Sequence, residues 1–301
     1  MEDFIVSTIR LSVPIVLAAV GVLFSLRARV FHLGIEGLMI MSAFAAVGVA
    51  QAVSSPLVAT LGGVAASLAL SLIYWFVIDR LQADTIIAGL GLGALATGLA
   101  AFLLQAIFDE RGSLDTDVRL PRPVTGDQSG PLALVSELSI LGWLTPALVA
   151  IAWFIMRRTR LGLELTAVGD YEYGARSAGI DPSIVRLKGI LLTGIWSALA
   201  GVELALGGLS TFSESISGGR GFIALAAALF GGLAPIGTAL AAVVFGAADA
   251  VGITTQVNNV DILPRPFILM IPYVLTILAL VASSFLRRTI DTKTKRHRSA
   301  T

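Results

Sequence analysis

The chain has 301 residues, of which 56% are hydrophobic and only 14% are charged. A soluble domain carries about 25% charged residues, so this composition indicates an integral membrane protein and excludes an ordinary soluble enzyme. There are no cysteines, which excludes disulfides, thiolate metal sites and cysteine nucleophiles. The two histidines, His32 and His297, are too few and too far apart in sequence to suggest a metal site. We expect no metal, no cofactor and no nucleic acid partner.

Charge-free apolar runs predict an all-α, polytopic transmembrane helix bundle that forms a single domain over residues 1–301. Crossing a bilayer takes about 20 apolar residues, and Ser54-Ser55-Pro56 supplies a turn that divides the longest run in two. About nine membrane segments result, one of them short or re-entrant. In chain order, the runs are Leu11–Leu26, Gly37–Ile78 (two segments), Thr85–Phe108, Leu138–Met156, Gly189–Leu209, Gly221–Ala248 (two segments) and Pro266–Leu286.

The run Gly221–Ala248 is ambiguous because Gly231-Gly232-Leu233-Ala234-Pro235 interrupts it. Its first half spans about 20 Å as a helix, which is short of a hydrocarbon core about 30 Å thick. It is either a tilted short span or one arm of a re-entrant pair. Both alternatives keep the chain on the same side of the membrane afterwards.

The distribution of lysine and arginine predicts the orientation, because cytoplasmic loops carry the excess of basic residues. With the N-terminus outside and the C-terminus in the cytoplasm, 15 of the 21 basic residues face the cytoplasm. The loop Arg157–Lys188 and the basic tail of residues 287–301 are then cytoplasmic. The polar loop Asp109–Glu137 is outside.

One short helix is predicted inside the cytoplasmic loop. Asp170 is a candidate N-cap, and Glu172 in the first turn can pair with Arg176 four residues later. Gly179 fits the left-handed position that ends a helix. The helix has about nine residues and a length of about 13 Å. It is either a docking element for another protein or an ordinary helical loop.

Three acids lie within or beside the apolar runs, where a carboxylate costs about 2.5–3.5 kcal/mol and therefore usually has a partner. Glu203 and Asp249 fall in the outer halves of their helices, so we expect them to line one outward-facing cavity. The alternative is an interhelical hydrogen bond, or an ion pair with Arg220 or Arg265. Glu36 falls at the cytoplasmic start of a helix, where the helix dipole favours an acid.

The chain contains no G-K-[ST] phosphate loop, so it shows no sign of hydrolysing a nucleotide itself. The glycines of Gly89-Leu90-Gly91-Leu92-Gly93 lie inside an apolar run with no preceding strand, which favours close helix packing over dinucleotide binding. If the protein moves a solute with ATP, the ATPase is another chain.

Four stretches together resemble one family, the permeases of ABC importers of the ribose, branched-chain amino acid and nucleoside type. Phe31–Met39 resembles the family's N-x-G-x-E-G segment, with His32 in place of the usual Asn. Gly162–Ile180 resembles its cytoplasmic loop, in which Tyr171-Glu172 replaces the usual Asn-Pro. Ser217–Ala226 is similar to its GRGFIALA stretch, which favours the nucleoside branch, and Phe230–Gly237 is similar to its F-G-x-x-x-P-x-G.

The resemblance implies a permease subunit in a bacterial plasma membrane, with the cytoplasmic loop as the coupling helix. Its partners would be ATP-binding subunits, a second permease of the same or a different sequence, an extracytoplasmic solute-binding protein and the lipid bilayer. The implied coupling residues are Gly169, Asp170, Tyr171, Ala175, Ala178, Gly179 and Ile180. The candidate pathway residues are Glu36, Glu203, Phe222 and Asp249.

The implied solute is a nucleoside, with a simple sugar as the alternative within the same class. An ion-coupled secondary transporter is the alternative in another class, and it predicts an inverted repeat with paired broken helices. Only one broken segment is visible, Gly231–Pro235. A channel-like pore would not need a capped cytoplasmic helix.

The topology is directly testable because the chain has no native cysteine. A cysteine introduced by Ser177→Cys should react only with membrane-permeant maleimides in intact cells, since the basic loop is cytoplasmic. Reaction of this cysteine from the outside alone would contradict the topology.

Overall fold

The computed structural model describes residues 2–123 and 138–257, which are almost entirely helical. The helices and strands are α1 (Glu2–Arg27), α2 (Ile35–Ala52), α3 (Pro56–Trp75) continued by η1 (Phe76–Arg80), α4 (Thr85–Phe108), β1 (Ser113–Asp115), α6 (Ile140–Arg158), α7 (Arg160–Asp170), α8 (Glu172–Ser177), α9 (Pro182–Val202) continued by η2 (Glu203–Leu209), β2 (Thr211–Ser213), α10 (Arg220–Phe230) and α11 (Pro235–Val257).

Seven helices within the described residues are long and apolar enough to cross a membrane. The expected count of about nine segments is therefore not confirmed. α10, with 11 residues, is too short to span, and the run Pro266–Leu286 lies outside the described residues, as does the basic tail. The predicted break at Ser54-Ser55-Pro56 is confirmed, because α2 ends at Ala52 and Pro56 begins α3.

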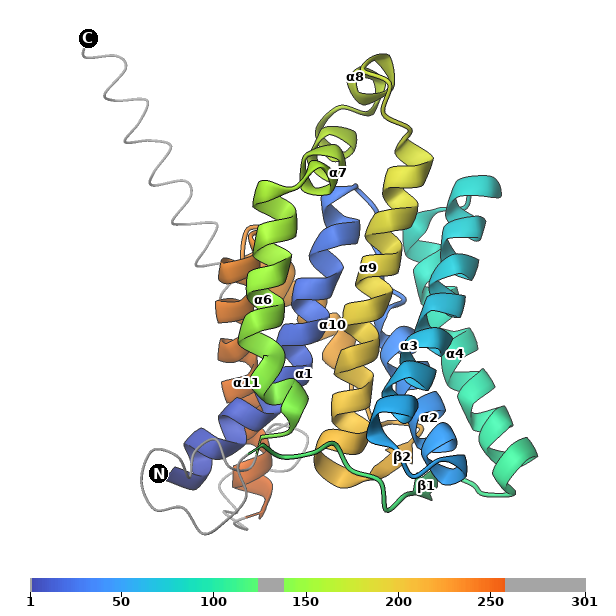
Figure 1. The fold of residues 1–301 in the computed structure, drawn as a ribbon, viewed down its shortest axis with the longest axis vertical. Helices are drawn as coiled ribbons and strands as arrows, with labels where there is room; N and C mark the ends of the chain where they lie inside the picture. Colours follow the sequence, from blue (N-terminus) through green and yellow to red (C-terminus); the bar gives the residue numbers. More distant parts are fainter. Residues whose placement is uncertain (1, 124–137, 258–301) are drawn as a thin grey trace.

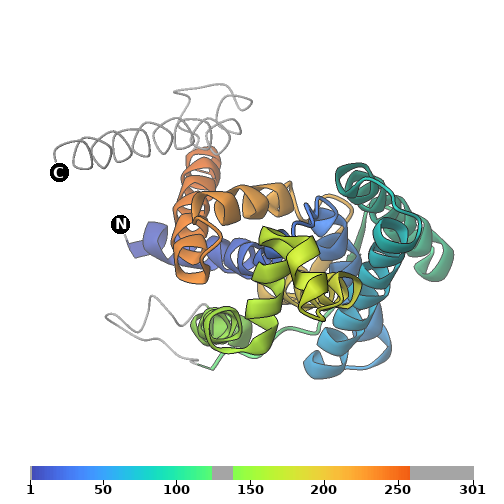
Figure 2. The same cartoon turned by 90° about the horizontal axis from the view of Figure 1, so that it is seen from above.

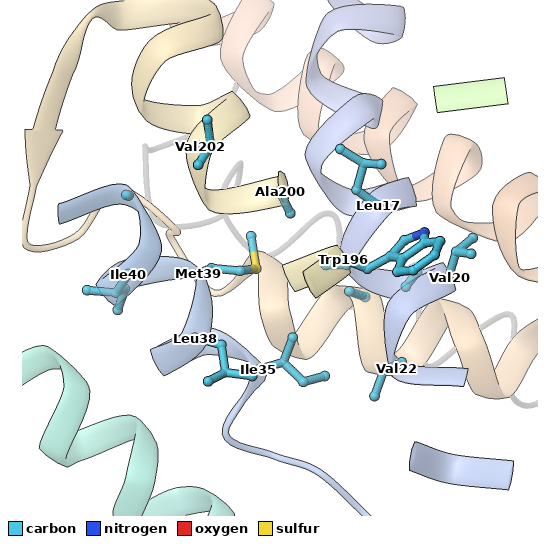
Figure 3. Packing of buried hydrophobic residues seen from close by; sticks show 14 of the residues in the cluster. Leu17, Val20, Val22, Ile35, Leu38, Met39, Ile40, Trp196, Ala200 and Val202 are labelled. Atoms are coloured by element: carbon cyan, nitrogen blue, oxygen red, sulfur yellow. The ribbon is translucent and has the colours of Figure 1, made fainter. Parts of the chain in front are cut away.

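Helix α1 lies at the centre of the bundle and packs against α9, α10 and α11. Figure 3 shows Leu17 and Val20 of α1 beside Trp196 of α9. The α1 residues from Ser12 to Leu26 are buried.

Small residues allow the close approach: a Cβ added at Gly21 would lie 2.4 Å from the Cβ of Trp196 on α9. The predicted packing role is confirmed for Gly89, where an added Cβ would lie 2.9 Å from the Leu33 amide nitrogen, and Gly37 of α2 lies close to Gly93. It is not confirmed for Gly91, where an added Cβ would meet nothing within 4 Å.

The two ends of the bundle carry different structures (Figure 1). Helices α7 and α8 cap one end. At the other end β1 pairs antiparallel with β2 in the register Ser113↔Ser213, which joins the segment after α4 to the segment after η2. We place α7 and α8 on the cytoplasmic side as a working orientation, in line with the predicted topology.

The segment between α1 and α2 enters the bundle before α2 begins, and Figure 2 shows α10 beside it. Gly221 at the start of α10 contacts Glu36, and Leu233 just beyond its end contacts Arg27. Eleven helical residues span about 16 Å, roughly half of a core about 30 Å thick. Glu36 lies in the first turn of α2, as predicted, and it is separated from the end of α1 by about the length of α10.

Candidate functional site

A polar cavity of about 340 Å³ lies between α1, η2 and α10, toward the end of the bundle that carries the strands. Its volume is within the range of small-molecule sites, about 300–1,000 Å³. Two irregular backbones flank it, because Pro14 lies inside α1 and η2 is a π-helix, a feature frequent at functional sites. Its lining residues are Ser7, Arg10, Leu11, Pro14, Glu203, Leu204, Gly208, Leu209, Ile216 and Arg220.

Glu203 is the buried acid of this cavity, with a 5% exposed side chain. Its Oε2 accepts a hydrogen bond of 2.5 Å from the Ser139 hydroxyl. The positive charges that reach it belong to Arg10 and Arg122. The small residue Gly207 leaves room for the carboxylate, because a Cβ there would lie 2.5 Å from the carboxyl carbon of Glu203. The sequence analysis gave an interhelical hydrogen bond as one alternative for this acid, but it did not identify Ser139 as the donor.

Asp249 does not line the cavity, but it holds the arginine that does. The guanidinium of Arg220 donates from Nε (3.2 Å) and from an NH2 nitrogen (2.7 Å) to Oδ2 of Asp249. Both side chains are largely buried, at 16% and 21% exposure. The expectation that both acids line one cavity therefore holds for Glu203 but not for Asp249, which reaches the cavity only through Arg220, its predicted ion-pair partner.

Glu36, in the first turn of α2, binds the start of α10 through both of its carboxylate oxygens. Its Oε1 accepts hydrogen bonds from the Ser217 hydroxyl (2.5 Å) and the Gly219 amide (2.8 Å). Its Oε2 accepts from the Gly221 amide (2.7 Å). The carboxylate satisfies amides that a helix N-terminus leaves unpaired, and it meets the positive end of the helix dipole. Two of the stretches that carried the family resemblance therefore form one contact.

Two other candidate positions lie away from the cavity. Phe222 is 43% exposed on α10 and is not among the lining residues. His32, where the sequence departs from the family pattern, is fully buried, and its ring stacks on Tyr74 with centroids 3.9 Å apart. The described structure gives His32 a packing role at this position.

The predicted cytoplasmic helix exists as α8, but its start differs from the prediction. Asp170 is the last residue of α7, and Tyr171 is the N-cap of α8, without a side-chain cap. α7 extends this far because Leu165 and Val168 are buried and fix it against the bundle. The helix is six residues long and not nine, because tertiary packing outweighed the local cap signal.

The predicted end of α8 is confirmed. Gly179 has φ +81°, in the left-handed region. Its amide donates to the Arg176 carbonyl, and the Ile180 amide donates to the Ala175 carbonyl, both at 3.0 Å. These are the two bonds of a Schellman motif.

The predicted pair of Glu172 and Arg176 is also present at 2.9 Å, and Arg186 on α9 adds a second bond at 2.5 Å. Partial burial acts to raise the pKa of Glu172. The hydrogen bonds and charges of Arg176 and Arg186 outweigh it and hold the pKa below its ordinary value. These contacts anchor α8 to the start of α9.

The exposed face of α8 differs from the expected one. Ala175 is buried at 4% exposure, so it packs α8 against the rest of the protein and is not available to a partner. Ala178 is exposed. Tyr171 (66% exposed) and Tyr173 (76% exposed) present aromatic rings to solvent. The sequence analysis missed Tyr173, although two aromatic residues around one acid in a polar loop were a usable signal.

Gly169 lies inside the protein and not on its surface. A Cβ added there would lie only 1.9 Å from the carbonyl oxygen of Arg27. Only glycine therefore allows the backbone of α7 to rest directly on the end of α1. This contact joins α7 to the central helix α1.

Comparison with known proteins gives a consistent result. The family model described as the permease component of the branched-chain amino acid transport system matches residues 4–280. The guanosine ABC transporter permease protein NupQ of Bacillus subtilis is 33% identical over 290 residues, which cover 91% of this chain and 89% of NupQ. The nucleoside ABC transporter permease protein NupC of Lactococcus lactis is 30% identical, over 89% of this chain and 88% of NupC.

A sugar permease is also similar to this chain. The glucose ABC transporter permease protein TsgB13 of Haloferax volcanii is 30% identical, over 92% of this chain and 76% of TsgB13. No solved structure matches the chain.

Ser139 offers a test of the cavity's construction, because its hydroxyl both caps α6 at Gly142 and donates to Glu203. Ser139→Ala should lower stability by about 0.5–2 kcal/mol for the cap and by a further 1.5–3 kcal/mol or so for the bond to the carboxylate. Thr159→Ala is the control, because it removes the cap of α7 and a bond to the Ile155 carbonyl but no bond to a carboxylate. Equal losses of thermal stability in the two purified variants would contradict a bond between Ser139 and Glu203.

Proposed function

Because the chain belongs to the permease family of the branched-chain amino acid transport system, we propose that it is the subunit through which an ATP-driven importer passes a nucleoside. Permeases of this family are non-catalytic, and a partner subunit hydrolyses the ATP. The observation that carries the choice of solute is the polar cavity that contains Glu203 and Arg220, together with the similarity to the nucleoside permeases.

The polar groups at the cavity suit a hydroxylated solute such as a nucleoside. Arg220 is paired with Asp249, and Glu203 accepts a hydrogen bond from Ser139, with Arg10 and Arg122 as its positive neighbours. A carboxylate and a guanidinium offer acceptors and donors for the hydroxyl, amide and ring nitrogen groups of a nucleoside.

A second, apolar cavity of about 530 Å³ between α1, α6 and α11 suits this solute poorly. Its two hydroxyl-bearing residues, Ser12 and Thr145, donate to backbone carbonyls of their own helices at 2.6 and 2.8 Å. A nucleoside there would lose its hydrogen bonds to water without replacement. The polar cavity is therefore our site of choice.

The assembly follows from the family and from the two ends of the bundle. We propose that ATP-binding subunits dock on the exposed residues Tyr171, Tyr173 and Ala178, because aromatic residues on a short, exposed helix are typical anchors of interfaces. A solute-binding protein would deliver the nucleoside at the opposite end, and a second permease would complete the pathway. The N-terminus is then outside and the C-terminus in the cytoplasm.

A simple sugar is the second candidate, favoured by the similarity to TsgB13. The same polar groups would bind its hydroxyls. An ion-coupled transporter is no longer favoured, because the family to which the chain belongs uses ATP hydrolysis by a partner.

Uptake competition tests the solute. In cells with the full set of subunits, unlabelled guanosine should inhibit uptake of labelled nucleoside, and ribose or glucose should not. Glu203→Gln and Asp249→Asn should each lower uptake by about ten-fold or more with normal membrane abundance, because losing one member of a buried charge pair costs about 2–5 kcal/mol. Glu110→Gln, an exposed acid outside the cavity, is the control. Inhibition by the sugar but by no nucleoside would overturn the choice of solute.

Ala178→Glu tests the docking surface. A long charged side chain should clash with the ATPase and weaken its binding by about 2 kcal/mol, or roughly thirty-fold. Co-purification of the ATPase and ATP-driven uptake should both fall, with normal membrane insertion. Ala178→Ser, which keeps a small side chain, is the matched control. Normal co-purification in Ala178→Glu would show that α8 is a solvated loop without a partner.

A further inference from the structure

The end of α1 at Arg27 lies between α7 of the proposed coupling loop and the turn that follows α10. On one side, the carbonyl oxygen of Arg27 lies against Gly169 of α7, so closely that no Cβ fits there. On the other side, Nε and an NH2 nitrogen of Arg27 both donate to the Leu233 carbonyl, at 3.0 and 2.7 Å. One residue thus contacts α7 through its backbone and the α10–α11 turn through its side chain.

The turn held by Arg27 is tight and strained. Leu233 has φ +56°, which is an unfavourable conformation for a residue with a branched side chain. Such a residue persists only where its surroundings hold it, and such strain gathers at functional sites. A Cβ added at Gly231 would lie 2.2 Å from the Thr238 amide nitrogen of α11. The α10–α11 hairpin is therefore closely packed, and a displacement of the turn must move α10.

The far end of α10 reaches the polar cavity. Arg220, its first residue, lines the cavity and pairs with Asp249 of α11. Glu36 holds the amides of Gly219 and Gly221 at the same point. α10 is a helix of about 16 Å that joins the Arg27 contact at one end to the cavity at the other.

We propose that Arg27 is a positioning residue that transmits movement of the ATPase-bound α7–α8 segment to α10, and through α10 to Arg220 in the cavity. This inference rests on the proposed function. The guanidinium holds one carbonyl with two N–H groups in a fixed plane, so it transmits orientation as well as position. The pathway is a contiguous series of packed backbone and hydrogen bonds, as long-range coupling requires.

A neighbouring arginine supplies a matched control. Arg29 is exposed, and it makes no ion pair and no side-chain hydrogen bond to residues 2–123 or 138–257. Arg29→Gln removes the same charge from the same turn as Arg27→Gln. The two variants should therefore differ only through the contact with Leu233.

The first experiment measures three properties of the assembled complex for the variants Arg27→Gln, Arg27→Lys and Arg29→Gln. Arg27→Gln should keep its ATPase on co-purification, lose uptake by about ten-fold because a charged hydrogen bond is lost, and no longer raise ATP hydrolysis when loaded binding protein is added. Arg27→Lys should recover part of the uptake, and Arg29→Gln should match the parent. Uptake in Arg27→Gln equal to that in Arg29→Gln would overturn the proposal, and so would loss of uptake that merely follows loss of the ATPase.

A second measurement keeps the proposal testable if Arg27→Gln is poorly produced. A fluorophore on a cysteine introduced by Ser215→Cys, an exposed position before α10, should change its emission when the ATPases are trapped with ATP and vanadate. In the Arg27→Lys background the change should shrink, and an unchanged response would overturn the proposal. This readout does not depend on the solute, so it tests Arg27 even if the parent complex transports no nucleoside.

Discussion

A single carboxylate inside the bundle determines where the functional elements lie. Glu36 accepts hydrogen bonds from the Ser217 hydroxyl and from the amides of Gly219 and Gly221. A partly buried carboxylate and a partly buried helix N-terminus each need hydrogen-bond partners inside a membrane protein. Together they satisfy one another, and the contact fixes α2 against α10. The position of Arg220, and so the charge of the cavity, follows from it.

Glycine makes this arrangement possible at both ends of α10. A Cβ at Gly221 would lie 2.6 Å from Oε2 of Glu36, and Gly219, at φ +82°, turns the chain into the helix. At the opposite end, Gly231 lets the hairpin with α11 close. The stretches that resemble the family thus contain the glycines that allow close contacts. Gly221 lets the backbone approach the Glu36 carboxylate, and Gly231 lets it approach the backbone of α11.

Local signals predicted what depends on local sequence. Thr85–Phe108 was predicted with its exact bounds because Asp84 and Asp109 flank a charge-free run, and both residues act as caps. The partner of Glu36 was not predictable, since it lies more than 180 residues away along the chain. Asp170 was misassigned as a cap because burial of Leu165 and Val168 extends α7 through it. Ala175 is a small residue of the kind expected at a docking surface, but its burial against the protein's own helices depends on tertiary packing, which the local sequence does not show.

Hydrogen–deuterium exchange at the start of α10 tests the central contact most directly. The parent and Glu36→Gln would be compared in the assembled complex, with peptides that cover Ser217–Phe222 and, as an internal reference, the buried middle of α1. The account predicts that the Gly219 and Gly221 amides exchange slowly in the parent and at least about ten-fold faster in Glu36→Gln, since a charged hydrogen bond contributes about 1.5–3 kcal/mol. The α1 peptide should not change. Equal exchange of Ser217–Phe222 in both proteins would contradict the account, because Glu36 would then not hold α10.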